Sequence, residues 1–380
     1  MTTPYAGQIG PGPRPARARV LRLLLAALLA TVFLASGLVV LAIIGSDTGP
    51  TGVLVGLALA AIPVFVVVPA LLWLDRFEAE PTGLLLFAFG WGAAVATLIA
   101  ILVNSTSIAL LKASGGDVTV GATVIAPIVE ETSKGLAVLL VFLYRRREFD
   151  GVIDGIVYAG MAGIGFAFTE NVLYLGRALA DSGVEGLAAT FVLRCIFGPF
   201  AHPLFTMATG VGFGIAVRTR RPIVRYVAPV AGWLVAVLLH GLWNLSTIAG
   251  LRGFVSAYVV LQVPIFLAAL GFALWSRRRE GQLIGQHLAV YAQTGWLTPD
   301  EVQMLASMPA RRRARAAARR YGGAPAARAM RGFQDSASEL ALLRERMSRS
   351  AAGSDAQDTE RMLLGQIAAD RAALATEPRR

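Results

Sequence analysis

Three ionisable residues lie within a single apolar stretch, in the order Glu130-Glu131-Thr132-Ser133-Lys134. On a helix Lys134 follows the two glutamates by four and three residues, so its ammonium group can neutralise one carboxylate and leave the other for chemistry. An ionisable side chain at the centre of a membrane costs roughly 2.5–3.5 kcal/mol on insertion scales, so each one needs a reason to be there. A charge-paired helix contact needs only one of the two glutamates. We therefore interpret Glu130, Glu131 and Lys134 as candidate catalytic residues.

Four further polar side chains interrupt later apolar stretches: Glu170, His202, His240 and Asn244. His240 and Asn244 are four residues apart, which places them on one face of a helix. Two of the three histidines of the chain thus fall in apolar segments. Counted from the outer ends of the predicted membrane spans, these residues and Glu130 all lie between the outer surface and about the middle of the membrane. Such a set supplies groups for general acid–base catalysis or ligands for a metal ion.

Prolines accompany two of these segments. Pro127 precedes Glu130 by three residues, and Pro199 and Pro203 flank His202. Because proline lacks an N–H and opens the helix, it leaves a carbonyl that lipid tolerates only where protein or water takes it up. We expect helix breaks at these sites, serving either as packing kinks or as a source of unpaired carbonyls for a substrate strand.

The elements that hold these groups must be membrane helices. Of 380 residues, 56 % are hydrophobic and 16 % charged, against roughly 25 % charged residues in soluble domains, which excludes one soluble enzyme domain. The single cysteine, Cys195, excludes a disulfide scaffold and a cysteine-based zinc cluster. Glycines in Gly160–Gly165 and Gly210–Gly214 predict close helix contacts.

Eight apolar runs are long enough to cross about 30 Å of hydrocarbon. They are Val20–Gly45, Gly52–Leu74, Gly83–Leu111, Val118–Tyr144, Val152–Gly176, Leu187–Val217, Tyr226–Ile248 and Phe254–Ser276. We therefore predict an all-α fold, a polytopic membrane bundle of about eight transmembrane helices with a basic cytoplasmic C-terminal tail.

Lysine and arginine are distributed unevenly between alternate loops of this arrangement. The loops on the side of the two termini hold 15 basic residues and the opposite loops hold 3, which predicts that both termini are cytoplasmic. We expect residues 1–19 to form a disordered cytoplasmic N-terminus, residues 20–276 a membrane domain, and residues 277–380 a basic, partly helical cytoplasmic tail.

The tail holds most of the positive charge, +7 of a formal net +11. Within it, Thr298 and Glu301 have the spacing of a capping box and predict a helix start. The stretch Arg311–Arg320 is polybasic and predicts a solvated or lipid-facing helix. Because no aromatic interleaving or binding motif accompanies it, we expect anionic lipid as the partner and no nucleic acid.

The polar motifs, taken in order, resemble those of the PrsW family of intramembrane proteases, relatives of the CAAX prenyl proteases. The resemblance covers about Leu71–Asn244 and rests on Asp75–Pro81, on EExxK at Glu130–Lys134, on FxxxENxxY at Phe166–Tyr174 and on the two histidine motifs. It implies hydrolysis of a peptide bond in a membrane-protein or peptide substrate, at a bacterial plasma membrane. Membrane-bound anti-sigma factors, cut at a first site, are a known type of substrate.

The same resemblance implies roles for individual residues. In the CAAX prenyl proteases a glutamate and a histidine activate water while a later histidine and asparagine steady the oxyanion. The resemblance therefore implies that Glu130 or Glu131 activates the water. It also implies that His240 and Asn244 correspond to the later histidine and asparagine. Glu170 stands where those proteases carry a histidine, and Lys134 replaces a more distant arginine.

Two mechanisms remain open for such a protease. In one, Glu130 or Glu131 is the base for a water without a metal. In the other, a Zn²⁺ ion held by Glu131, Glu170, His202 and His240 lowers the pKa of the water toward 7, and the two imidazoles and two carboxylates favour this version.

The competing function is a proton- or ion-coupled secondary transporter, whose relay also needs intramembrane carboxylates and histidines. A transporter predicts an inverted repeat, and the sequence shows none. The HExxH, GxSxG and GxGD signatures of other proteases are also missing from the sequence.

Overall fold

The computed structural model describes residues 16–77, 80–145, 149–349 and 355–376, and every regular element in these ranges is a helix. The elements are α1 (Ala16–Leu74), α2 (Thr82–Gly90), the π-helical η1 (Trp91–Ala96), α3 (Thr97–Ala113), α4 (Val118–Val120), π-helical η2 (Gly121–Ile125), α5 (Ala126–Tyr144), α6 (Val152–Phe191), π-helical η3 (Val192–Phe197), α7 (Ala201–Arg218), α8 (Pro222–Ile248), α9 (Gly250–Ala257), π-helical η4 (Tyr258–Gln262), α10 (Val263–Gln293), α11 (Pro299–Leu305), α12 (Met308–Ser348) and α13 (Ala356–Thr376). The predicted all-α membrane bundle is confirmed. Of the predicted disordered N-terminus, residues 1–15 lie outside the described ranges and residues 16–19 belong to α1.

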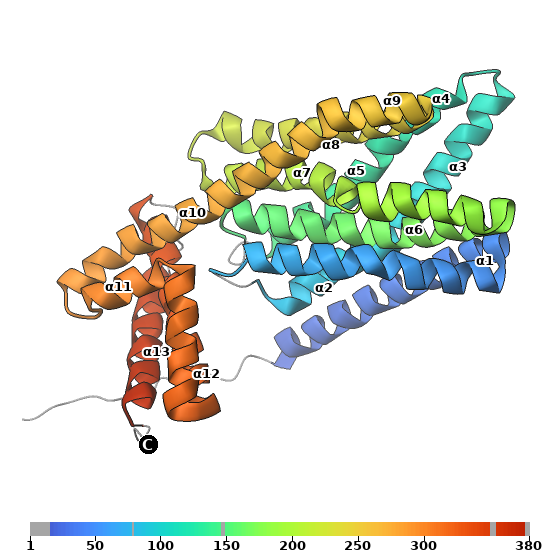
Figure 1. Ribbon diagram of the computed structural model, residues 1–380. Coiled ribbons are helices and arrows are strands. Elements are labelled where there is room, and N and C mark those ends of the chain that lie inside the picture. The colour runs from blue at the N-terminus through green and yellow to red at the C-terminus, as the bar shows by residue number, and fades with distance from the viewer. Residues whose placement is uncertain (1–15, 78–79, 146–148, 350–354, 377–380) are drawn as a thin grey trace, which may run out of the picture.

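Five helical stretches in the described ranges are long and apolar enough to cross a membrane: Leu24–Leu74, Thr82–Ala113, Val152–Arg218, Pro222–Ile248 and Gly250–Gln293. Two of them have a glycine with positive φ in their interior, Gly49 in α1 (φ 70°) and Gly183 in α6 (φ 62°). Figure 1 shows that α1 and α6 fold back on themselves at the same end of the bundle. Each of these two stretches therefore contains two of the predicted spans. The predicted span Val118–Tyr144 is also helical, but it is more polar than the five stretches named above. The total of eight membrane spans therefore stays a prediction.

The helix α6 runs through the centre of the bundle and is buried without interruption from Ile153 to Ala167. The glycines of α6 permit the close approach of neighbouring helices. A Cβ on Gly155 would collide with the backbone carbonyl of Gly210 on α7, and a Cβ on Gly210 would collide with the backbone carbonyl of Gly155. A Cβ on Gly163 would lie 2.8 Å from the carbonyl oxygen of His202. The expected glycine contacts are confirmed, and they bring the backbones of α6 and α7 together beside the polar residues.

Of the expected helix breaks, the structure has the one at Pro199 and Pro203, whereas the helix continues without a break from η2 through Pro127 into α5. Pro127 follows the π-helical segment η2 and lies in the first turn of α5. Pro199 lies in the turn between η3 and α7, and Pro203 lies in the first turn of α7, where an N–H has no helical partner in any case. These breaks let the helix carrying His202 start afresh near the middle of the bundle.

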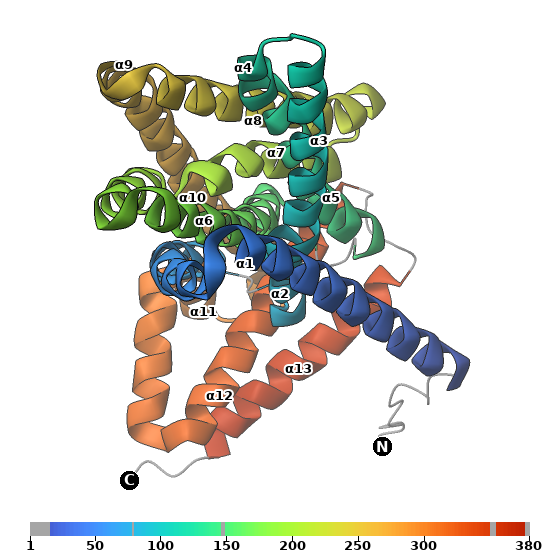
Figure 2. The ribbon, with the colours of Figure 1, turned by 90° about the vertical axis from the view of Figure 1, so that its right-hand side faces the viewer.

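The C-terminal helices α11, α12 and α13 pack on one side of the membrane helices (Figure 2). The helix α11 starts with the predicted capping box, in which Glu301 N–H donates to Thr298 Oγ1 (3.2 Å) and Thr298 N–H donates to Glu301 Oε2 (2.7 Å). The apolar core of this unit includes Leu288, Leu340 and Ile367, together with Phe77 from the loop between α1 and α2. The tail is therefore joined to the membrane helices through a shared core.

The prediction of an exposed polybasic helix is wrong for Arg311. Its side chain is fully buried and donates to the carbonyl oxygens of Phe77 (3.0 Å) and Gln334 (2.9 Å) and to Ser338 Oγ (3.0 Å). Phe77 lies in the loop between α1 and α2, and Gln334 and Ser338 lie in the part of α12 beyond Gly323, so the residues next to Arg311 in sequence do not indicate them. The neighbouring arginines Arg312, Arg313, Arg319 and Arg320 are exposed, as predicted.

We predict that Gly210→Ala lowers the melting temperature of the detergent-purified protein by several degrees, because overpacking of this kind costs about 1–3 kcal/mol. The matched control is Gly37→Ala, since no atom lies within 4 Å of a Cβ added at that helical glycine. Equal melting temperatures for both variants would show that α6 and α7 do not need this contact.

The distribution of basic residues predicts cytoplasmic termini. A phosphatase reporter, active only outside the cytoplasm, should be inactive when fused after Arg380, and a cytoplasm-dependent fluorescent reporter at the same site should be active. The opposite pair of signals would overturn the orientation.

Candidate active site

The predicted polar residues converge from four helices. Glu130, Glu131 and Lys134 lie on α5, and Glu170, His202 and His240 come from α6, α7 and α8. At the centre Lys134 Nζ donates to Glu131 Oε1 at 2.5 Å, and both side chains are fully buried. In a water-free interior each charge needs a partner of opposite sign. The Lys134–Glu131 pair therefore provides the fixed point around which the other groups are arranged.

The two nitrogens of His240 face the two neighbouring glutamates. Its Nδ1 lies 2.9 Å from Glu131 Oε1, and its Nε2 lies 3.6 Å from Glu130 Oε2. A carboxylate only accepts hydrogen bonds, so we assign the imidazole proton to Nδ1. The lone pair of His240 Nε2 then points toward Glu130.

His202 also contacts a glutamate through one ring nitrogen, but through Nε2 where His240 uses Nδ1. Its Nε2 lies 2.8 Å from Glu170 Oε2, and its Nδ1 lies 3.2 Å from Lys134 Nζ. Glu170 also forms an ion pair with Arg194 and is thereby held as a carboxylate. We therefore assign the proton of His202 to Nε2, which leaves the lone pair of Nδ1 on the side of Lys134. The histidine rings lie with their centroids 5.0 Å apart.

Glu130 is the least satisfied member of the cluster. Its Oε1 accepts a hydrogen bond from Asn104 Nδ2 (3.1 Å), whereas its buried Oε2 has no hydrogen-bond partner among the residues that the structure describes. Lys134 Nζ stands 4.0 Å from that oxygen. A buried oxygen without a partner is costly in a folded protein unless something else binds there. Glu130 Oε2 is thus the position at which a proton, a water or a cation fits.

One ligand atom each of Glu130, His202 and His240 fall within 4.8 Å of one another, which is the spacing of a metal-binding group. This trio differs from the predicted set of Glu131, Glu170, His202 and His240. Glu131 and Glu170 instead contact ring nitrogens of the two histidines, as the outer partners of metal-binding histidines commonly do. Glu130 and Glu131 are adjacent on α5, and their spacing in the sequence does not determine which carboxylate points toward the histidines. That depends on the side-chain rotamers, which only the structure gives.

Asn244 has a role that the sequence did not indicate. Its Nδ2 donates to the carbonyl oxygen of Ala122 at 2.8 Å. In the π-helical segment η2, Ala122 would bond to the N–H five residues later, but that residue is Pro127, which has none. Asn244 thus satisfies the carbonyl that Pro127 leaves open, and this hydrogen bond is to the backbone of η2 rather than to the carboxylates.

Three supporting residues were not among the predicted site residues. Asn104 and Arg194 are polar residues in apolar stretches, and they bind Glu130 and Glu170. Thr206 Oγ1 donates to Glu131 Oε2 at 2.9 Å. The first two could have been recognised by the same criterion as the glutamates, whereas a threonine in a membrane helix carries no such signal.

Comparison with known proteins identifies the family of this site. A sequence model described as PrsW family intramembrane metalloprotease matches residues 80–269, half of the chain and all of the polar cluster. No solved structure matches the chain.

Curated relatives agree with this match. Protease PrsW of Geobacillus kaustophilus is 33% identical over 173 residues, which is 45% of this chain and 69% of the relative. Protease PrsW of Oceanobacillus iheyensis is 32% identical over 155 residues (41% and 65%), and that of Clostridioides difficile is 25% identical over 189 residues (49% and 76%). The resemblance seen in the motifs is confirmed, and the chain is a multi-pass membrane peptidase that belongs to the PrsW family of intramembrane metalloproteases.

Proposed function

We propose that this protease cuts a membrane-bound protein with Glu130 as the group that meets the attacking water, and that Glu130, His202 and His240 are the residues that hold a Zn²⁺ ion. The unpartnered Oε2 of Glu130, facing His240 Nε2, is the observation that supports this assignment. The family match supports the protease and gives no support to the competing transporter hypothesis.

The charges of the cluster support a bound cation. Three carboxylates, Glu130, Glu131 and Glu170, are accompanied by two permanent cations, Lys134 and Arg194. Lys134 lies closest to Glu131 and Arg194 pairs with Glu170, so the uncompensated negative charge falls on Glu130. A buried carboxylate in this position either takes up a proton or binds a cation.

The donor set also fits the metal named in the family description. Two imidazoles and one carboxylate form a common zinc site with a position left for water. Zinc bound here would lower the pKa of a water and polarise the peptide carbonyl. Glu131 keeps the proton of His240 on Nδ1, and Glu170 keeps that of His202 on Nε2. His240 Nε2 and His202 Nδ1 are then the unprotonated nitrogens, and a metal on His202 Nδ1 would take the place of its contact with Lys134.

The carboxylate of Glu130 has a second use in hydrolysis. In the metal-free mechanism, Oε2 is placed to accept the proton of the water that attacks the peptide carbonyl and then to return that proton to the leaving amine. Lys134 Nζ, 4.0 Å away, stabilises the charged form of Glu130 between these transfers. The metal-free mechanism needs the same oxygen, so Glu130 is required in either version.

The wider setting stays a proposal. A single-span protein of the anti-sigma-factor type is the expected substrate, cut at a first site at a bacterial plasma membrane. The exposed arginines Arg312, Arg313, Arg319 and Arg320 support contact with anionic lipid at the cytoplasmic face.

Replacing the two glutamates separates catalysis from stability. Glu130→Gln should lower the cleavage rate of fluorescein-labelled casein in detergent by about 10²–10⁴-fold at an unchanged melting temperature. Glu131→Gln should abolish cleavage and also lower the melting temperature, because Lys134 loses its nearest partner and an unpaired buried charge costs about 3–5 kcal/mol. Glu185→Gln, at an exposed glutamate of α6, is the control. Wild-type rates for Glu130→Gln would refute the proposed site.

Metal analysis tests the ligands directly. The purified protein should hold about one zinc ion per chain, and His202→Ala and His240→Ala should lose it, whereas His287→Ala in α10 should keep it. Chelation should remove both zinc and activity, and added zinc should restore activity. Full cleavage by metal-free protein would instead establish the mechanism that uses Glu130 alone.

A further inference from the structure

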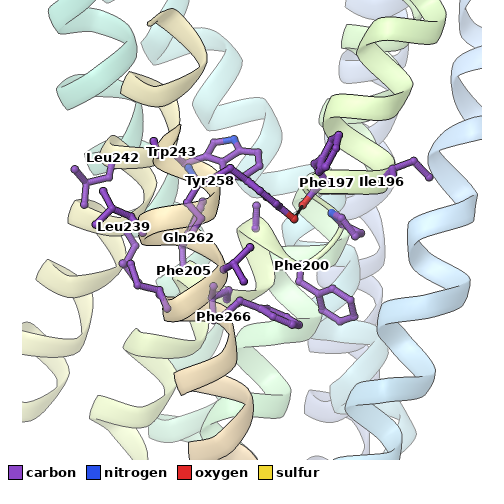
Figure 3. Close-up of a pocket in the computed structure, with 17 residues that line it drawn as sticks. Ile196, Phe197, Phe200, Phe205, Leu239, Leu242, Trp243, Tyr258, Gln262 and Phe266 are labelled. Carbon is purple, nitrogen blue, oxygen red and sulfur yellow. Dashed lines mark hydrogen bonds between the residues drawn. The ribbon is translucent and has the colours of Figure 1, made fainter. Parts of the chain in front are cut away.

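An apolar cavity of about 270 Å³ lies between α7, α8, η4 and α10, and Figure 3 shows the side chains that line it. Its walls are mainly aromatic and aliphatic, and they include Phe197, Trp243, Tyr258 and Phe266. Drug-sized ligands occupy pockets of roughly 300–1,000 Å³. The cavity is therefore suited to one or two large side chains rather than to a large ligand.

The cavity adjoins the catalytic cluster. One of its walls is Phe205, whose ring stacks on His240 with centroids 5.2 Å apart and an interplanar angle of 24°. The same ring lies 6.0 Å from that of His202. The Phe205 ring thus lies between the cavity and the two histidines, so a group bound in the cavity lies about one ring away from them.

Gln262, one of the residues that line the cavity, has an amide oxygen without a partner, and this favours a peptide as the occupant. Gln262 Nε2 donates to Ser246 Oγ (3.0 Å), but the buried Gln262 Oε1 has no hydrogen-bond partner in the described part of the chain. A lipid chain offers no donor for such an oxygen, whereas a peptide backbone has an N–H at almost every residue.

We propose that this cavity is the subsite for a bulky apolar side chain, of leucine or phenylalanine size, that flanks the scissile bond of the substrate. A turn of the Gln262 side chain brings its Oε1 to an N–H of the same peptide. The proposal rests on the proposed function, since it takes the histidines beyond Phe205 as the catalytic ones. It adds a specificity that the catalytic groups alone do not supply.

The test maps the bonds that the purified full-length protein cuts in casein, by mass spectrometry of the products. The wild type should cut next to Leu, Phe, Ile and Met. Ala257→Phe places a ring in the cavity and should lower the ratio of kcat/KM for bulky over small flanking residues by roughly tenfold or more. Ala268→Phe, at an exposed position of α10, adds the same ring outside the cavity and should leave the ratio unchanged.

A second variant keeps the test decisive if Ala257→Phe does not fold. Phe266→Ala enlarges the cavity from α10 and should shift the preference toward tryptophan. A cut-site profile identical in the wild type and in the folded cavity variants overturns the subsite, provided that Glu130→Gln abolishes the cutting. If no cutting depends on Glu130, the proposed active site fails instead, so the two failures are distinguishable.

Discussion

The ion pair between Lys134 and Glu131 is the interaction on which the rest of the site depends. Both side chains are fully buried, and neither charge is tolerable in such an interior without the other. The pair also sets the positions of its neighbours, because Glu131 holds His240 and Lys134 contacts His202. Helices α5, α7 and α8 must therefore meet around this pair, and α6 joins them through the contact of Glu170 with His202. The glycines of α6 and α7 make that approach sterically possible.

Much of this arrangement could be predicted from the sequence because lipid makes polar side chains conspicuous. An ionisable residue in an apolar run is rare, so Glu130, Glu131 and Lys134 stood out without any knowledge of their contacts. The helix break at Pro199 was predictable for a similar reason, since proline acts on its own helix, whereas at Pro127 the helix only changes to the π-helical segment η2 and continues.

The remaining features depend on contacts between distant segments. Which glutamate keeps an unpartnered oxygen is decided by Asn104 and His240, which lie on α3 and α8. The hydrogen bond of Asn244 exists because Pro127 on another helix leaves a carbonyl open. Arg311 could not be distinguished from its exposed neighbours, because its acceptors are 23 to 234 residues away in sequence.

The insertion of Phe77 into the core of the C-terminal helices affects the order in which the protein is made. Phe77 emerges early in synthesis, in the loop between the first two helices, whereas its apolar partners such as Leu340 and Ile367 emerge near the end. The ribosome has therefore produced nearly the whole chain before this aromatic side chain is covered. Until then the loop presents an apolar group at the membrane surface, which a chaperone can bind during assembly. The core that Phe77 shares with the C-terminal helices can therefore be completed only after all of the membrane helices have been synthesised.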